Sequence, residues 1–193
     1  MNEIYLFADT ETTGFPSEKI EKTDPKQARC VQLAGLLTDH DGKSLAEFSC
    51  ILKREQFSIP AFVADIHGIS DSVADAYGLE RKTAFAVFGQ MVRRATTVIA
   101  HNFAFDNRVL EIEDAHHNYG WALAPKNVCT MTLATPICKL PKARGEGYKR
   151  PKMQEAYKHF FGKEFDGVHD ALADVRACRD VFFKLRASNF ING

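Results

Sequence analysis

Two carboxylates lie close together near the N-terminus, in the stretch FADTETTG at residues 7–14. Asp9 and Glu11 are two residues apart, so on an extended chain their side chains point to the same side. Two such carboxylates repel each other unless a cation lies between them, and hard oxygen ligands favour magnesium or manganese. A solvated strand end is the simpler interpretation of this pair alone. Further residues are needed to favour a metal site.

More acidic residues and a histidine follow at the expected ends of later elements. Asp106 comes four residues after Asn102, so the two share a helix face near a strand-to-helix junction, where open α/β sheets commonly bind ligands. In the stretch VHDALAD at residues 168–174, Asp170 can cap a helix, Asp174 lies about one turn inside it, and His169 precedes it. The spacing alone leaves both Asp170 and Asp174 open as a possible ligand.

These residues together suit two-metal phosphoryl chemistry. Two cations about 4 Å apart need several carboxylates to neutralise and space them. A water nucleophile also needs a base that titrates near neutrality, which histidine supplies. Each residue also has a structural explanation, as a helix cap, a solvated helix position or a packed helix start.

The elements that must position these residues follow from hydrophobic periodicity. The apolar run at residues 4–8 predicts a buried strand that ends at the acids, and residues 14–27 predict a loop where a substrate could lie. Residues 30–38 and 45–52 predict a β-hairpin, with Asp41-Gly42 supplying the positive backbone angles of its turn. Two further short strands are expected, at 97–100 and around Val128.

Helical spacing predicts the remaining elements. Short helices are expected after Pro60 and Ser70, and residues 83–94 form an amphipathic helix with Ala84, Val87, Phe88 and Met91 on its apolar face. Further helices are expected after residue 102 and at 131–138, 153–161 and 172–186, with an irregular segment at 140–150. Because 193 residues with 45% hydrophobic content can build one core and no repeat or linker interrupts them, we expect a single α/β domain with a mixed sheet.

Composition limits the classes of partner and compartment. The chain has 25 basic and 25 acidic residues, so it lacks a global positive field, and a nucleic acid would have to be bound locally. Residues 139–152 carry six basic residues against Glu146, and could contact a phosphate backbone or simply be solvated. Five cysteines without a C-x-x-C pair indicate neither disulfides nor a zinc site. With no apolar run of about 18 residues and an acidic N-terminus, we expect a cytoplasmic protein in a reducing compartment, without a membrane partner.

Three motifs resemble, in order, those of the DEDDh (DnaQ-like) 3′–5′ exonuclease family: DTETTG at 9–14, HNxxFD at 101–106 and HDAxxD at 169–174. The first motif, with its ETTG at 11–14, looks closest to that of the proofreading epsilon subunit of bacterial DNA polymerase III and of similar phage or stand-alone exonucleases. Ribonuclease T and oligoribonuclease, which act on RNA, are more distant members. The resemblance implies a ribonuclease H-like α/β fold, a mixed five-stranded sheet flanked by helices. It also implies a single exonuclease domain over residues 1–193, with a core at about 3–187.

The resemblance also implies roles for individual residues. Asp9, Glu11, Asp106 and Asp174 would hold two divalent cations, Mg²⁺ or Mn²⁺, and His169 would be the general base that deprotonates the attacking water. Substrate contacts would come from a further set of residues: Thr12, Gly14, Phe15, His67, Asn102 and Phe105. Two of these have alternatives, because Phe105 also belongs to an apolar helical stripe and His67 could simply end a helix.

The function implied is the release of nucleoside 5′-monophosphates from 3′ ends of single-stranded or frayed DNA, in proofreading or end-trimming. The alternatives are an exoribonuclease of the ribonuclease T or oligoribonuclease kind and an end-binding module without catalysis, which would be expected to lack at least one acid. The sequence ends at Gly193, without the long C-terminal extension through which the proofreading subunit joins its polymerase. We therefore expect a stand-alone enzyme, or one loosely associated with a DNA polymerase.

Overall fold

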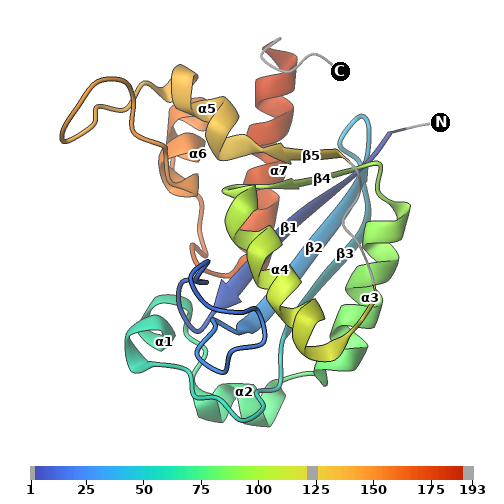
Figure 1. Ribbon diagram of the computed structural model, residues 1–193. Helices are drawn as coiled ribbons and strands as arrows, with labels where there is room; N and C mark the ends of the chain where they lie inside the picture. The colour runs from blue at the N-terminus through green and yellow to red at the C-terminus, as the bar shows by residue number, and fades with distance from the viewer. Residues whose placement is uncertain (1–2, 121–125, 189–193) are drawn as a thin grey trace.

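A mixed five-stranded sheet forms the centre of the computed structural model, which describes residues 3–120 and 126–188 (Figure 1). The strand order is β3-β2-β1-β4-β5. β1 pairs antiparallel with β2 and parallel with β4, while β2–β3 is antiparallel and β4–β5 is parallel. The strands are β1 Ile4–Thr12, β2 Cys30–Asp39, β3 Ser44–Ile51, β4 Thr97–Ala100 and β5 Lys126–Cys129. The expected mixed five-stranded sheet is confirmed.

Helices cover both faces of this sheet (Figure 1). The long helix α7 packs with α5 and α6 on one face, and α3 and α4 pack on the other. The small helices α1 and α2 lie beside the end of β1 that carries the acids, with their own apolar cluster. The helices are α1 Ala61–His67, α2 Asp71–Tyr77, α3 Arg81–Arg94, α4 Phe103–His117, α5 Thr130–Cys138, α6 Met153–Phe161 and α7 Ala171–Ala187.

β1 is buried on both faces, and its alternation decides where each side chain points. Tyr5 and Phe7 pack into the cluster under α7, whereas Leu6 and Ala8 pack into the cluster under α3 and α4. Because successive strand residues point to opposite faces, Asp9 and Glu11 continue the α7 face. β1 runs beyond the predicted residues 4–8 to Thr12, so both acids lie within the strand.

The β2–β3 hairpin forms as predicted, but its turn differs from the prediction. Of Asp41 and Gly42, only Gly42 has a positive φ, of 89°. The Asp39 carboxylate instead accepts hydrogen bonds from the backbone N–H groups of Asp41 and Lys43, at 3.0 and 2.9 Å. This side-chain turn lets one glycine close a longer loop, so a second left-handed residue is unnecessary.

The helix at 83–94 is also confirmed, with one error in its predicted face. It begins at Arg81, and Val87 is 41% exposed instead of packing in the core. Phe85 and Val92 are buried beside Ala84, Phe88 and Met91, so the apolar stripe is centred away from Val87.

The other predicted helices lie where the periodicity placed them. Pro60 stands at the N-cap of α1, and the Ser70 hydroxyl caps α2 by accepting a bond from the backbone N of Val73. Within the described residues, no helix is both long and apolar enough to span a membrane.

Candidate active site

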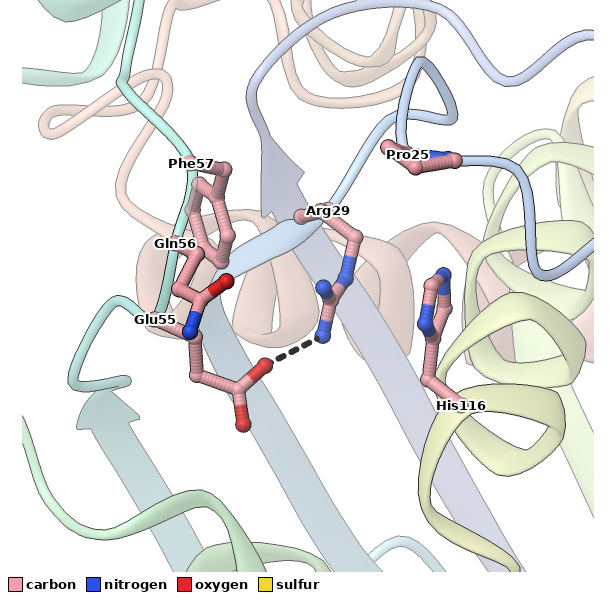
Figure 2. A pocket seen from close by; sticks show the side chains of 6 residues that line it. All are labelled: Pro25, Arg29, Glu55, Gln56, Phe57 and His116. Atoms are coloured by element: carbon pink, nitrogen blue, oxygen red, sulfur yellow. Dashed lines mark hydrogen bonds and ion pairs between the residues drawn. The ribbon is translucent and has the colours of Figure 1, made fainter.

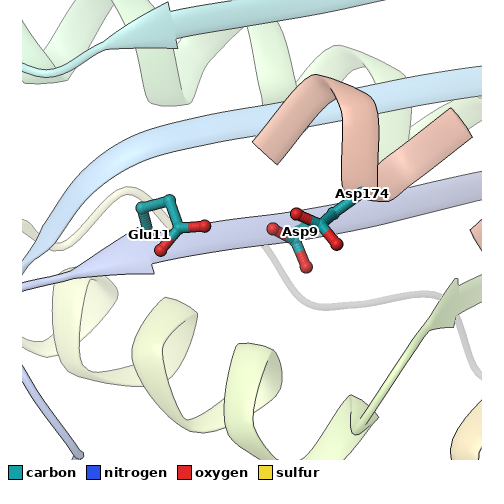
Figure 3. A group of neighbouring side chains, drawn as sticks. All are labelled: Asp9, Glu11 and Asp174. Carbon is teal, nitrogen blue, oxygen red and sulfur yellow. The ribbon is translucent and has the colours of Figure 1, made fainter. Parts of the chain in front are cut away.

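Three carboxylates from two elements meet beside the sheet. Asp9 and Glu11 extend from β1 and Asp174 from the first turn of α7, and one oxygen from each lies within 4.8 Å of the others (Figure 3). Asp9 and Glu11 share the face of β1 that packs against α7, which is why an α7 side chain can reach them. The two residues that sequence spacing placed on one side of a strand are therefore joined by a third acid.

The start of α7 distinguishes Asp170 from Asp174. The Asp170 carboxylate caps the helix, accepting hydrogen bonds from the backbone N of Leu172 at 2.9 Å and of Ala173 at 3.3 Å. Asp174, one turn later, reaches the other carboxylates, and its Oδ2 accepts a bond from the backbone N of His169 at 2.8 Å. His169 has a φ of 67°, an uncommon backbone state for a residue with a side chain.

Asp106 approaches from the other face of the sheet. It lies in the first turn of α4, is 4% exposed, and accepts hydrogen bonds from the backbone N and the hydroxyl of Thr10, at 3.0 and 2.8 Å. It is outside the close group of three carboxylates. It nevertheless lines the same cavity, so the sheet end brings all four predicted acids to one place.

A cavity of about 150 Å³ contains most of the predicted site. Asn102 is one of the residues that line the cavity, and it stands at the N-cap of α4 with a left-handed backbone of φ 77°. The residues that line the cavity are Asp9, Thr10, Glu11, His101, Asn102, Phe105, Asp106, Met153, His169 and Asp174.

Burial and mutual repulsion raise the pKa values of these acids. Burial, and then the charges of Asp174 and Asp106, raise the pKa of Glu11 to about 8. Burial likewise raises the pKa of Asp106 to about 7, although the two hydrogen bonds from Thr10 lower it. Burial also raises the pKa of Asp174 to about 6, although the hydrogen bond from the His169 backbone N–H lowers it. The pKa of Asp9 is raised well above its usual range by burial and then by the charges of four neighbouring acids, Asp106, Asp174, Glu11 and Asp170. A cation among them would relieve both costs, so the donor set fits a hard divalent ion.

One histidine, His169, lines the cavity with the acids, and a second, His67, lies outside the cavity lining. Burial, and then the charge of Lys152, lower the pKa of His169, so its ring is neutral and can accept a proton at neutral pH. His67 ends α1 and its Nδ1 accepts a bond from the backbone N of Ile69 at 3.1 Å. Burial also lowers the pKa of His67, with the Thr12 backbone opposing and His169 adding to the effect. His67 therefore both ends a helix and lies beside Thr12 and His169.

Phe105 lines the cavity, and the ring of Phe15, which does not line it, contacts Phe105. Phe15 is 90% exposed, and its ring meets the edge of Phe105 with centroids 6.1 Å apart. Phe105 packs against the α3–α4 core, which confirms its place in the apolar stripe, and it also lines the cavity, so its contact with substrate stays a prediction. The Thr12 hydroxyl donates to the backbone oxygen of Gly14 at 2.6 Å, and Gly14 has a φ of 152°. Thr12 and Gly14 thus shape the turn that presents Phe15.

Three lining residues were not predicted as site residues: Thr10, His101 and Met153. His101 bridges two segments, because its Nε2 lies 3.0 Å from the Pro151 carbonyl and its Nδ1 lies 2.9 Å from the Thr130 hydroxyl. Burial lowers the pKa of His101 to about 4. A carbonyl can only accept, so Nε2 carries the proton and Thr130 donates to Nδ1. The only sequence signal for His101 is its place in the second motif.

A larger cavity, of about 570 Å³, shares no lining residue with the carboxylate site (Figure 2). Arg29 lies on its floor, paired with Glu55 at 2.9 Å and with the buried Glu113 at 3.1 Å. Because these charges are satisfied within the protein, the smaller cavity with its unpaired acids is the better candidate for chemistry. The lining residues of the larger cavity are Pro25, Arg29, Glu55, Gln56, Phe57 and His116.

The sheet order, the helices on both faces and the four acids with one histidine at the end of β1 agree with the fold and the site that the three sequence motifs predict. The chain belongs to the RNase T exonuclease family, described as "Exonuclease", whose model matches residues 6–182. A comparison with curated proteins gave no match.

Solved structures of exonuclease I share the fold. The enzyme from Methylocaldum szegediense has a TM-score of 0.73 at 22% identity, with 97% of this chain and 41% of that chain covered. Escherichia coli exonuclease I with a dT13 oligonucleotide has a TM-score of 0.74 at 20% identity, and the match covers 98% of this chain and 42% of that chain. The zinc-bound complex of the same enzyme with single-stranded DNA has a TM-score of 0.71 at 20% identity, and the match covers 98% of this chain and 41% of that chain. The chain thus spans about two-fifths of the length of these structures.

Proposed function

We propose that the chain is a divalent-metal-dependent 3′–5′ exonuclease that releases nucleoside 5′-monophosphates from single-stranded or frayed DNA ends, in proofreading or end-trimming. The convergence of Asp9, Glu11 and Asp174 within 4.8 Å, with Asp106 lining the same cavity, carries the proposal. One buried and three half-buried acids with raised pKa values, none of them ion-paired to a basic residue that the structure describes, are costly to keep together unless they bind cations.

In this mechanism Asp9, Glu11, Asp106 and Asp174 hold two cations, Mg²⁺ or Mn²⁺. When bound, such cations activate water as a nucleophile and stabilise charge on the leaving oxygen. His169 accepts the proton of the attacking water at its ring, which is neutral because of burial and Lys152. The backbone N–H of His169 meanwhile holds the Asp174 carboxylate in place.

The terminal nucleotide lies between the rings and the acids. Phe15 and Phe105 offer aromatic surface to a base or sugar, and stacking of this kind holds single strands without reading their sequence. Gly14 lets the backbone approach the 3′ end closely, because its φ of 152° disfavours a side chain. Thr12, His67 and Asn102 complete the wall of this subsite.

Single-stranded DNA is the favoured substrate. The structures with a similar fold include E. coli exonuclease I bound to oligonucleotides and to single-stranded DNA. RNA is the second candidate, because the matching family carries the name of RNase T. We take residues 1–193 as one exonuclease domain, because the family match covers 6–182 and a single sheet organises the described residues. We further propose a DNA polymerase as a loose partner and a cytoplasmic location, which suits the five free cysteines.

The test is a time course with matched 5′-labelled DNA and RNA oligonucleotides, with Mg²⁺ or EDTA, using the wild type and Asp9→Asn. We expect a ladder that shortens from the 3′ end, requires the metal and is lost in the variant. The faster of the two substrates decides between DNA and RNA. Binding of 3′ ends without any shortening would replace this proposal with an end-binding module.

A further inference from the structure

The segment between α5 and α6 projects from the body of the molecule as an arm, residues 139–152 (Figure 1). It is closed at its base by a bond from the backbone N of Lys149 to the oxygen of Leu140, at 2.9 Å, and by a bridge between Pro141 and Tyr148. The Lys142 Nζ donates to the Glu146 carbonyl at 2.8 Å across the tip. The arm therefore has a folded shape without a hydrophobic core of its own.

The arm is strongly cationic in a chain with no net charge. It contains Glu146 as its single acid and six basic residues: Lys139, Lys142, Arg144, Lys149, Arg150 and Lys152. Lys149 is neutralised by Glu155 at 2.6 Å. Lys139, Arg144 and Arg150 are exposed, and none of them forms an ion pair with any part of the chain that the structure describes. Exposed charges of one sign that lie together without acidic partners attract a polyanion and raise its local concentration.

The base of the arm is fastened to the wall of the candidate active site. The Pro151 carbonyl accepts a bond from His101 Nε2 at 3.0 Å, and His101 lines the carboxylate cavity. Met153, two residues beyond Pro151, lines the same cavity. One end of the cationic arm is thus joined to the wall of the cavity where the terminal nucleotide would bind.

We propose that the arm binds the phosphate backbone of the substrate strand on the 5′ side of the scissile bond, through Lys139, Arg144 and Arg150. This inference rests on the proposed function, because it needs a strand whose 3′ end lies among the four acids. The contact is electrostatic, so it favours longer strands, depends strongly on salt and does not distinguish sequences. Exposed Tyr148, at 43%, adds an aromatic surface beside these cations for an upstream base.

The experiment compares the wild type with a triple variant, Lys139→Gln, Arg144→Gln and Arg150→Gln. The matched control removes three exposed cations from α3, with Lys82→Gln, Arg93→Gln and Arg94→Gln, so both variants have the same net charge. A charge-preserving variant, Lys139→Arg, Arg144→Lys and Arg150→Lys, separates charge from shape. KM and kcat are measured on 5′-labelled DNA from about 20 nucleotides down to a dinucleotide, and binding of the longest strand is followed against salt in EDTA.

For the triple variant we expect KM on the longest strand to rise roughly tenfold or more, and this ratio to approach one as the strand shortens. The slope of log affinity against log salt should fall by about 2, because each single-strand phosphate contact contributes about 0.7. The control and the charge-preserving variant should stay near the wild type. Three results would each overturn the proposal that the arm binds the substrate. These are an unchanged salt slope in the triple variant, a KM increase on the dinucleotide equal to that on the longest strand, and a KM increase in the α3 control equal to that in the triple variant.

The two proposals fail in different ways. If the wild type does not shorten any strand, the proposed function is wrong, whatever the arm does. If the wild type shortens DNA but the triple variant keeps its KM and salt slope, the arm proposal alone is wrong.

Discussion

Asp106 of α4 accepts two hydrogen bonds from Thr10 of β1, one from the backbone N at 3.0 Å and one from the hydroxyl at 2.8 Å. Thr10 points to the α4 face of the sheet, while its neighbours Asp9 and Glu11 point to the α7 face. β1 therefore carries Asp9 and Glu11 on its α7 face and, through Thr10, holds Asp106 on its α4 face. Its two donors also favour the ionised form of a carboxylate that burial disfavours.

Thr10→Val should weaken this link without a large change of shape. The hydroxyl donor is lost and the backbone donor remains, so the pKa of Asp106 rises and the acid limb of the pH–rate profile moves to higher pH. A hydrogen bond to a charged group is worth about 1.5–3 kcal/mol, so we expect kcat/KM near pH 7 to fall roughly ten- to a hundredfold. Thr10→Ser, which keeps the hydroxyl, is the control. An unmoved acid limb in Thr10→Val would show that Asp106 does not depend on this bond.

Asp9→Asn and Asp174→Asn should each abolish turnover and leave the fold intact. Removing one of the clustered carboxylates relieves burial and repulsion, so in EDTA the melting temperature should rise above that of the wild type. With Mg²⁺ the order should reverse, because only the wild type gains from the ion. Asp65→Asn changes an exposed acid of α1 and serves as the control for one lost charge. Equal melting temperatures for all four proteins in EDTA would contradict the view that the clustered carboxylates destabilise the metal-free protein.

His169→Ala should separate proton transfer from metal binding. The contact to Asp174 comes from the backbone N of residue 169, so truncating the ring leaves this bond in place. Loss of a general base costs about 10²–10⁴ in rate. We therefore expect kcat to fall in this range while the affinity for Mn²⁺, measured by titration, stays within about threefold. A wild-type rate at neutral pH would exclude His169 as the base.

Local pattern accounts for what could be predicted from the sequence. The period of two in β1 put Asp9 and Glu11 on one face, and the cap at Asp170 located the start of α7. Helical and strand periodicity also located most elements of the described chain. Each of these predictions depends on residues a few positions apart, where backbone geometry alone decides which side chains are neighbours.

The remaining features depend on contacts that periodicity does not encode. Thr10 meets Asp106 across 96 positions, and His101 meets Pro151 across 50. The apolar Val87 fits a helical stripe in sequence, yet packing of α3 against the sheet centres that stripe elsewhere. Asp41 was expected in a left-handed state because the longer loop closed by Asp39 could not be foreseen.

The metal-free protein should lose stability as pH rises. The folded-state pKa values of Glu11, Asp106 and Asp174 are raised to about 8, 7 and 6, so between about pH 4 and pH 8 the unfolded chain binds fewer protons at these acids than the folded one. The contribution of these acids to stability is therefore present at low pH and lost as pH rises through the folded pKa values.

Urea unfolding in EDTA at pH 5.5 and pH 8 measures this loss. In Asp9→Asn, the comparison variant, the free energy of unfolding should fall less between the two pH values. Saturating Mg²⁺ should remove most of the difference at pH 8. A stability in EDTA that rises over this range would contradict the raised pKa values.

Glu113 should matter for stability although it lies outside the candidate site. It is fully buried, and its carboxylate accepts bonds from Arg29 Nε at 3.1 Å and from the Cys30 backbone N at 2.9 Å, and pairs with Arg81 Nη2 at 2.5 Å. Although burial opposes it, these arginines hold the pKa of Glu113 below its usual range. The carboxylate thus joins α4 to the starts of β2 and α3.

Glu113→Gln keeps the shape and removes the charge, leaving the buried Arg81 without its carboxylate partner and Arg29 with Glu55 alone. Breaking a buried pair in this way costs about 3–5 kcal/mol, which urea unfolding will measure. Adding Arg81→Met removes one orphaned charge, so the double variant should recover part of the loss. Asp106 lies two turns earlier on the same side of α4, so kcat should also fall in Glu113→Gln and recover with stability. An additive loss in the double variant would show that Glu113 and Arg81 act independently.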